Sequence, residues 1–218
     1  MNIQDSIIFF MEILGTIAFA ASGAMVGIRK RMDIFGICVL GVVTAVGGGM
    51  TRDVILGKLP SALEKPVYVV VSVITSLAIF ILLYIKHDLL SGRLGTFYDK
   101  AMLIMDSVGL GIFTSLGVMS GIDNGYPDNS FLLVFIGMLT GVGGGLMRDM
   151  MAGGVPTILR KKVYALAAGI GALIYQLLVE HNTCPQGLAI LAGAGSIIVI
   201  RLSATVFKWN LPTLKDLD

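Results

Sequence analysis

The sequence predicts an all-α integral membrane protein in which seven transmembrane helices form two inverted three-helix repeats plus a seventh helix. Three observations predict this fold. Charged residues make up 14% of the chain and hydrophobic residues 56%, whereas soluble domains average about 25% charged residues. Hydrophobic runs of spanning length recur along the whole chain, and one segment of twenty residues occurs twice.

Seven hydrophobic runs approach or exceed the roughly 20 apolar residues that a spanning helix needs. They cover approximately residues 7–28, 34–57, 66–86, 101–121, 130–154, 163–180 and 185–207. The segment between the fourth and fifth runs contains Asn124-Gly125 and Pro127-Asp128, which are typical of turns. Regular spacing of the runs predicts a single membrane domain over residues 1–218.

Lysine and arginine are distributed unequally between the two sides of the predicted membrane. Twelve fall on one side, Arg201 among them, and only Lys58 and Lys65 fall on the other. Arg52 and Arg148 belong to the repeated segment and are not counted. Because positive charge concentrates in cytoplasmic loops, we expect the N-terminus outside and the C-terminus in the cytoplasm.

The repeated segment reads GVVTAVGGGMTRDVILGKLP at residues 41–60 and GMLTGVGGGLMRDMMAGGVP at residues 137–156. The two copies share ten of twenty positions without a gap. The repeat also extends upstream, where the residues at positions 12, 15, 19 and 23 of the first unit correspond to those at 106, 109, 113 and 117 of the second. Each unit, about 7–86 and about 101–180, has three helices, so the second must enter the membrane from the opposite side.

Three consecutive glycines interrupt each copy and allow two interpretations. Glycine is unfavourable in a helix interior by roughly 1 kcal/mol relative to alanine, so the triplets predict kinks that free carbonyls toward a polar passage. The alternative is tight helix packing, and the two can coexist. The glycines concerned are Gly47, Gly48, Gly49, Gly143, Gly144 and Gly145.

A threonine and an arginine flank the glycines on one helical face in each copy. Thr44 and Arg52 are eight residues apart, as are Thr140 and Arg148. The threonine hydroxyl, the bare glycine backbone and the arginine side chain would then lie in a line along the helix, an arrangement that suits the wall of a pore. Alternatively, each arginine snorkels or forms a structural clip with an aspartate, for which the next residues, Asp53 and Asp149, are available.

Four further polar residues are candidates on the first and fourth helices. Glu12 and Asp106 lie at equivalent positions of the repeat and could serve as counter-ions for the arginines or attract cations to a pore mouth. For Glu12 we favour a solvated acid at a helix end. Ser22 and Ser107 are candidate pore hydroxyls.

Enzyme chemistry and nucleic-acid binding are not indicated. The two histidines, His87 and His181, fall in predicted loops on opposite sides, and the sequence has no Cys/His metal spacing, P-loop or dinucleotide fingerprint. We therefore expect no enzyme, no cofactor and no bound metal. Basic residues on the cytoplasmic side could hold anionic lipid headgroups, although topology alone explains them better.

The doubled GGGxxRDxxxGxxP segment, the inverted three-plus-three arrangement and the seventh helix resemble the prokaryotic TRIC (trimeric intracellular cation) channel family, which overlaps bacterial membrane proteins catalogued as glycine transporters. The resemblance covers about residues 7–207. It implies a homotrimer in the plasma (inner) membrane of a prokaryote, with an hourglass-shaped pore in each protomer. It also implies permeation of K+ and Na+ through that pore, which is lined by the second and fifth helices, kinked at their glycines with the Arg-Asp pairs beside them. The lysine-containing motif by which animal members bind phosphoinositides is not found as such, so lipid binding stays open.

Three hypotheses follow. The first is a channel for monovalent cations, K+ and Na+, with a pore within each protomer. The second is a secondary transporter for glycine or a similar small zwitterion, because inverted repeats with broken helices suit it equally. The third is a structural membrane protein whose glycines only pack helices.

Overall fold

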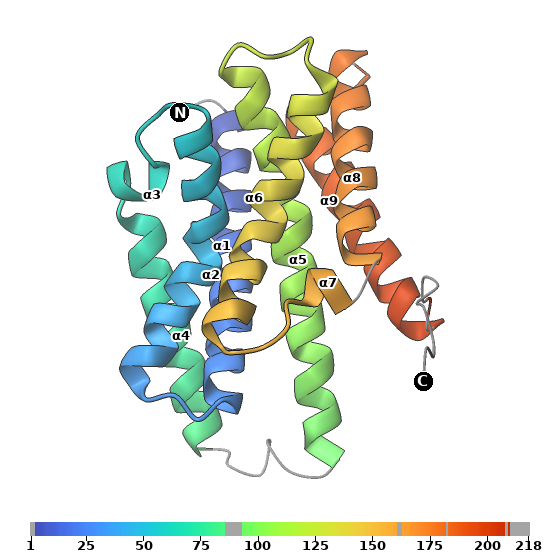
Figure 1. Cartoon of the computed structure of the whole chain (residues 1–218). Helices are drawn as coiled ribbons and strands as arrows, with labels where there is room; N and C mark the ends of the chain where they lie inside the picture. Colours follow the sequence, from blue (N-terminus) through green and yellow to red (C-terminus); the bar gives the residue numbers. More distant parts are fainter. Residues whose placement is uncertain (1–2, 86–92, 161–162, 182, 208, 210–218) are drawn as a thin grey trace, which may run out of the picture.

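The computed structural model describes residues 3–85, 93–160, 163–181, 183–207 and 209. Within these residues, seven helices are long and apolar enough to cross a membrane (Figure 1). They are α1 (Ile3–Arg29), α2 (Ile34–Ile55), α4 (Val67–Ile85), α5 (Arg93–Asp123), α6 (Ser130–Met151), α8 (Val163–Glu180) and α9 (Gln186–Val206). Two short helices, α3 (Ser61–Glu64) and α7 (Thr157–Arg160), follow α2 and α6.

The seven predicted spans are confirmed, and their bounds shift for physical reasons. Helix α5 begins at Arg93 rather than near 101, so a polar first segment extends the span. Helix α2 ends two residues before its predicted bound, and helix α6 ends three residues before its predicted bound. In both, a glycine with positive φ, Gly57 at 71° and Gly153 at 66°, ends the helix. Residue 86, the predicted end of the third span, and His87 lie outside the described residues.

Corresponding helices of the two units run in opposite directions in Figure 1. Helix α1 descends from the N-terminus while α5 ascends, and α2 ascends while α6 descends. Helix α1 packs against α5, and α2 packs against α6, so that the two units meet along these four helices. Helix α9, which has no partner in the repeat, packs against α5 and α8.

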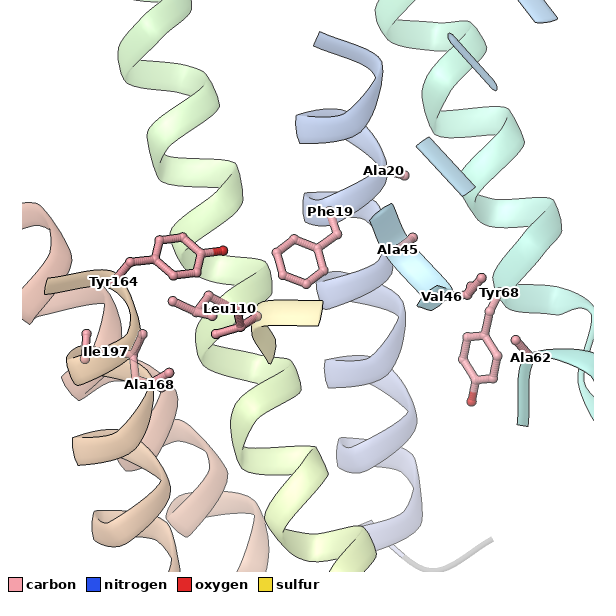
Figure 2. Close-up of a cluster of buried hydrophobic side chains, with 12 residues drawn as sticks. Phe19, Ala20, Ala45, Val46, Ala62, Tyr68, Leu110, Tyr164, Ala168 and Ile197 are labelled. Carbon is pink, nitrogen blue, oxygen red and sulfur yellow. The ribbon is translucent and has the colours of Figure 1, made fainter. Parts of the chain in front are cut away.

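The junction between the units is a pair of phenylalanines. The rings of Phe19 in α1 and Phe113 in α5 stack with centroids 5.4 Å apart. Each ring lies over a glycine of the other unit, Phe19 over Gly109 and Phe113 over Gly15. Figure 2 shows Phe19 in the middle of a buried cluster that also contains side chains of α2 and α4 on one side and of α8 and α9 on the other. This cluster therefore joins both units.

Candidate functional site

The end of each repeated segment is a Schellman motif, in which a glycine with positive φ closes the helix. In α2 the amide of Gly57 donates to Val54 O at 3.1 Å, and the amide of Lys58 donates to Asp53 O at 3.0 Å. In α6 the amide of Gly153 donates to Met150 O at 3.0 Å, and that of Gly154 to Asp149 O at 2.9 Å. The shared glycine of the motif is therefore required by the turn.

The aspartate of each copy anchors the short helix that follows the turn. Asp53 Oδ2 accepts hydrogen bonds from the amide and hydroxyl of Ser61 at 2.7 and 2.9 Å. Asp149 Oδ2 accepts the same two bonds from Thr157, both at 2.7 Å. Each carboxylate thus satisfies donors at the start of α3 or α7 that have no partner within the helix.

The arginine of each copy binds the other oxygen of the adjacent aspartate. Arg52 Nε and Nη2 both lie 2.8 Å from Asp53 Oδ1. Arg148 Nε and Nη2 lie 2.9 and 2.8 Å from Asp149 Oδ1. Each arginine therefore pairs with its own aspartate, as the clip interpretation expects, and a conducting role for either arginine stays a separate proposal.

The glycines bring α2 and α6 into direct backbone contact. A methyl group on Gly48 would overlap the carbonyl oxygen of Thr140, and one on Gly144 would overlap that of Thr44. Both helices stay α-helical through their glycine triplets. The predicted kinks are therefore not interruptions of the helix, and a bend of the helix axis stays a prediction. The packing interpretation is confirmed at this crossing, where the two glycine faces touch instead of facing each other across a passage.

Not all six glycines are in tight contacts. Gly47 lies against the sulfur of Met147, and Gly143 lies against the Cα of Gly48. Gly145 lies beside the hydroxyl of Tyr164, whereas a methyl group on Gly49 would have only Arg52 Nη2 nearby, at 3.8 Å. The triplets therefore contain positions with and without room for a side chain.

The two threonines of the motif are buried and bonded within their own helices. Thr44 Oγ1 donates to Leu40 O and Thr140 Oγ1 donates to Ile136 O, each at 2.6 Å. Both are at most 1% exposed. Neither lines the cavity beside Arg52 or the cavity beside Arg148. A pore-lining role for these hydroxyls stays a prediction.

The second copy belongs to a buried charge network. Arg148 Nη1 donates to Asp106 Oδ1 and to Ser22 Oγ, both at 2.6 Å. The second oxygen of Asp106 accepts from Arg201 Nη1 at 2.7 Å. The predicted counter-ion role of Asp106 is confirmed, and the polar partner of Arg148 on α1 is Ser22. Ser107, the other candidate hydroxyl, donates to Leu103 O at 2.7 Å within its own helix.

Arg201 was not predicted as a site residue. Its position in the sequence predicts a cytoplasmic charge, but its side chain is 5% exposed, and its guanidinium lies 4.2 Å from the ring centroid of Tyr164. One signal in the sequence could have identified it. Arg201 follows the apolar run Ile197–Ile200 inside the last spanning helix, and charges within spans are rare and paired.

The first copy has different surroundings. Glu12, the counterpart of Asp106, is half-buried and accepts a hydrogen bond from the Tyr68 hydroxyl. It therefore has a protein partner, and its solvation stays a prediction. Lys58 Nζ lies 3.6 Å from Asp53 Oδ1 and donates to Ser120 Oγ at 3.1 Å. Among the described residues, the hydrogen bonds of the Arg52 side chain go to Asp53 alone.

Two cavities lie beside the two copies. The first cavity, about 200 Å³, is lined by Glu12, Arg52, Asp53, Lys58, Phe113 and Asp123, among others. The second cavity, about 400 Å³, is lined by Arg29, Asp99, Lys100, Asp106, Arg148 and Arg201, among others. On α5 the two linings come within seven residues of each other, from Phe113 to Asp106, which is about 10 Å along the helix. The Phe19–Phe113 stack lies in this interval.

Comparison with protein families identifies one match. The family model described as "Glycine transporter" matches residues 9–84 and 103–180. These two ranges coincide with the two predicted three-helix units, and together they cover more than half of the chain.

Curated relatives match over nearly the full length. The chain is 36% identical to the UPF0126 inner membrane protein YadS of Escherichia coli (strain K12), covering 95% of this chain and 96% of the relative. It is 33% identical to the UPF0126 membrane protein YvgT of Bacillus subtilis (strain 168), covering 93% and 94%. These relatives are named membrane proteins, in agreement with the seven apolar helices.

Solved structures of the same fold are cation channels. A structure described as a TRIC cation channel is 33% identical, with a TM-score of 0.81, covering 96% of this chain and 98% of that one. The TRIC orthologue from Rhodobacter sphaeroides is 30% identical, with a TM-score of 0.82, covering 94% and 100%. A TRIC channel from C. elegans, at 18% identity and a TM-score of 0.62, shares the fold. The chain is thus an integral membrane protein of the Glycine transporter family, and it belongs with the prokaryotic TRIC channels.

Proposed function

We propose that this chain conducts monovalent cations, K+ and Na+, through a path within each protomer that residues of α2 and α6 help to line. The observation that carries the proposal is the pair of cavities, which approach each other along α5 and are separated by the Phe19–Phe113 stack and the Asp106 network. Two polar cavities that nearly meet inside a membrane protein suit a passage that opens and closes.

The charges of the first cavity favour cations over anions. Three carboxylates line it, those of Glu12, Asp53 and Asp123, together with two cations, Arg52 and Lys58. Three negative and two positive charges leave one net negative charge, which attracts a monovalent cation. The similarity to solved TRIC cation channels supports the same assignment.

In this proposal the two units are inverted repeats, with the N-terminus outside and the C-terminus in the cytoplasm of a prokaryotic plasma (inner) membrane. The opposite directions of corresponding helices and the excess of Lys and Arg on one side support it. We also propose a homotrimer, since a similar structure is described as a trimeric channel. Chemical cross-linking in native membranes tests the trimer, and bound lipid is tested by mass spectrometry of the purified assembly.

The alternative is a secondary transporter for glycine or a similar small zwitterion. One observation favours it: the first cavity presents carboxylates for an ammonium group and Arg52 and Lys58 for a carboxylate. The description of the matching family agrees with it. A volume of about 200 Å³ is sufficient for a small amino acid.

Electrical recording from purified protein in planar bilayers separates the two functions. The channel proposal predicts unitary currents in KCl without any amino acid, with a reversal potential that follows the K+ gradient rather than the Cl− gradient. Bilayers fused with empty vesicles are the control. Saturable glycine counterflow without unitary current would support the transporter instead, and neither activity would leave a structural role.

A further inference from the structure

Two tyrosines, Tyr68 and Tyr164, lie 96 residues apart, the same offset as the two copies of the repeated segment, and they make different contacts. Tyr68 on α4 donates its hydroxyl hydrogen bond to Glu12. Tyr164 on α8 corresponds to it, yet its hydroxyl is buried and has no hydrogen-bond partner among the residues that the structure describes. A buried hydroxyl without a partner costs free energy, so the second unit holds an arrangement that leaves this group unsatisfied.

The carboxylate that corresponds to Glu12 is occupied by other donors. Asp106 uses one oxygen for Arg148 and the other for Arg201. Arg201 comes from α9, which has no counterpart in the repeat, and its guanidinium lies over the Tyr164 ring. Arg201 therefore binds the acid that the tyrosine binds in the first unit.

The geometry points to an exchange at Asp106, and we propose that Arg201 is the residue that controls it. Arg201 holds Asp106 in place as a partner of Arg148. Without Arg201, the Tyr164 hydroxyl takes Asp106 as its acceptor, as Tyr68 takes Glu12. Arg148, which already lines the second cavity, then loses its hold on Asp106 and is free to move within that cavity. Arg201 acts through Asp106 and is a positioning residue. The proposal rests on the proposed channel function.

The charges of the network give the direction of the effect. Asp106 and Asp149 balance Arg148 and Arg201, two against two, within the described residues. Among the charged residues that line the second cavity, four are positive and two are negative. Neutralising Arg201 lowers their net charge from +2 to +1, which makes the cavity more favourable for a cation. Both the exchange and the charge therefore predict easier opening to cations, and an experiment must separate them.

Single-channel recording of Arg201→Gln, Tyr164→Phe and the double variant performs that separation. We expect Arg201→Gln to raise the open probability about fivefold or more, the lower range of coupling between sites. Tyr164→Phe alone should match the wild type, because its hydroxyl is unbonded. The double variant should return to the wild-type value, since the acceptor exchange needs the hydroxyl. Arg201→Lys, which keeps the charge, should stay near the wild type.

Asp106→Glu provides a second approach that leaves Arg201 in place. The longer side chain of glutamate matches Glu12 of the first unit, so it should favour the Tyr164 hydroxyl, raise the open probability and lose this effect when combined with Tyr164→Phe. An unchanged open probability in folded Arg201→Gln overturns the proposal. So does a rise that persists in the double variant, because charge alone would then explain it.

Thermal unfolding in detergent tests the exchange without current. In the wild-type background Tyr164→Phe should leave the midpoint unchanged. In the Arg201→Gln background it should lower the midpoint, because the new bond to Asp106 is lost. Absence of K+ current in the wild type would reject the channel function and leave this test intact. Equal effects in both backgrounds would reject the exchange itself.

Discussion

The two copies of the Arg-Asp motif have the same internal geometry and different surroundings. In both, the arginine binds one oxygen of its aspartate and the other oxygen anchors the following short helix. Arg52 then lines the first cavity beside Lys58, with 12% of its side chain exposed. Arg148 is 5% exposed and is held by Asp106 and Ser22.

The difference separates two contributions. The repeated motif determines the turn, and the residues around the motif determine what the arginine contacts. The motif alone builds the helix end, the turn and the anchor, since both copies do so in the same way. The element outside the repeat, α9, brings Arg201 to Asp106 and completes the buried network. The first unit has no such helix, and its acid binds Tyr68 instead.

Removing the acid of each unit should give the largest difference in stability between the two sites. Asp106→Asn deprives Arg148 and Arg201 of a shared buried counter-ion, and loss of one partner of a buried ion pair costs about 3–5 kcal/mol. Glu12→Gln removes an acceptor that binds one hydroxyl, which costs about 1 kcal/mol. Thermal unfolding in detergent measures both. Equal shifts of the midpoint would contradict the difference between the sites.

The helix crossing should respond equally in both copies. Gly48→Ala and Gly144→Ala each place a methyl group onto the backbone of the facing helix, and overpacking of this kind costs about 3 kcal/mol. Gly49→Ala, where the space is open apart from Arg52 Nη2 at 3.8 Å, is the matched control. Yield of monodisperse protein and the unfolding midpoint are the measurements. A tolerated Gly48→Ala would show that the helices are not in contact there.

The anchors of the short helices should give the smallest effect, again equal in both copies. Ser61→Ala and Thr157→Val remove the hydroxyl bond to the aspartate and keep the amide bond. The loss of a capping hydrogen bond costs about 1 kcal/mol. Unfolding midpoints should fall slightly and by similar amounts. A large shift in one variant alone would mean that α3 and α7 have different roles.

Much of this comparison could be predicted from the sequence. Hydrophobic runs predict the seven spans because lipid requires about 20 apolar residues per helix. Preserved spacing of Gly, Arg, Asp and Pro predicts two equivalent turns, and the adjacent Arg52 and Asp53 predict the clip. A counter-ion role of Asp106 toward one of the arginines is also an expectation from the sequence, because an acid recurs at equivalent positions of the repeat; which arginine it binds is not.

The remaining contacts depend on how the helices pack in three dimensions. Arg201 belongs to a helix without a repeat partner, so no alignment within the chain relates it to Asp106. Glu12 lies near the start of its predicted span, where a solvated acid is the common case, and the structure brings Tyr68 to it from α4. Whether Gly48 faces a passage or a helix depends on the distance between α2 and α6, which hydropathy does not determine.

The most direct test compares Arg52→Gln with Arg148→Gln in single-channel recordings from purified protein in KCl without amino acid. Lys65→Gln is the control, because it removes a positive charge from the same predicted side as Arg52, and Lys65 is not among the residues that line the first cavity. We predict wild-type unitary currents, a changed unitary conductance in Arg52→Gln and a changed open probability in Arg148→Gln. Currents identical to the wild type in both variants would mean that the two arginines only hold the helix ends, and would contradict a role for them in conduction or opening.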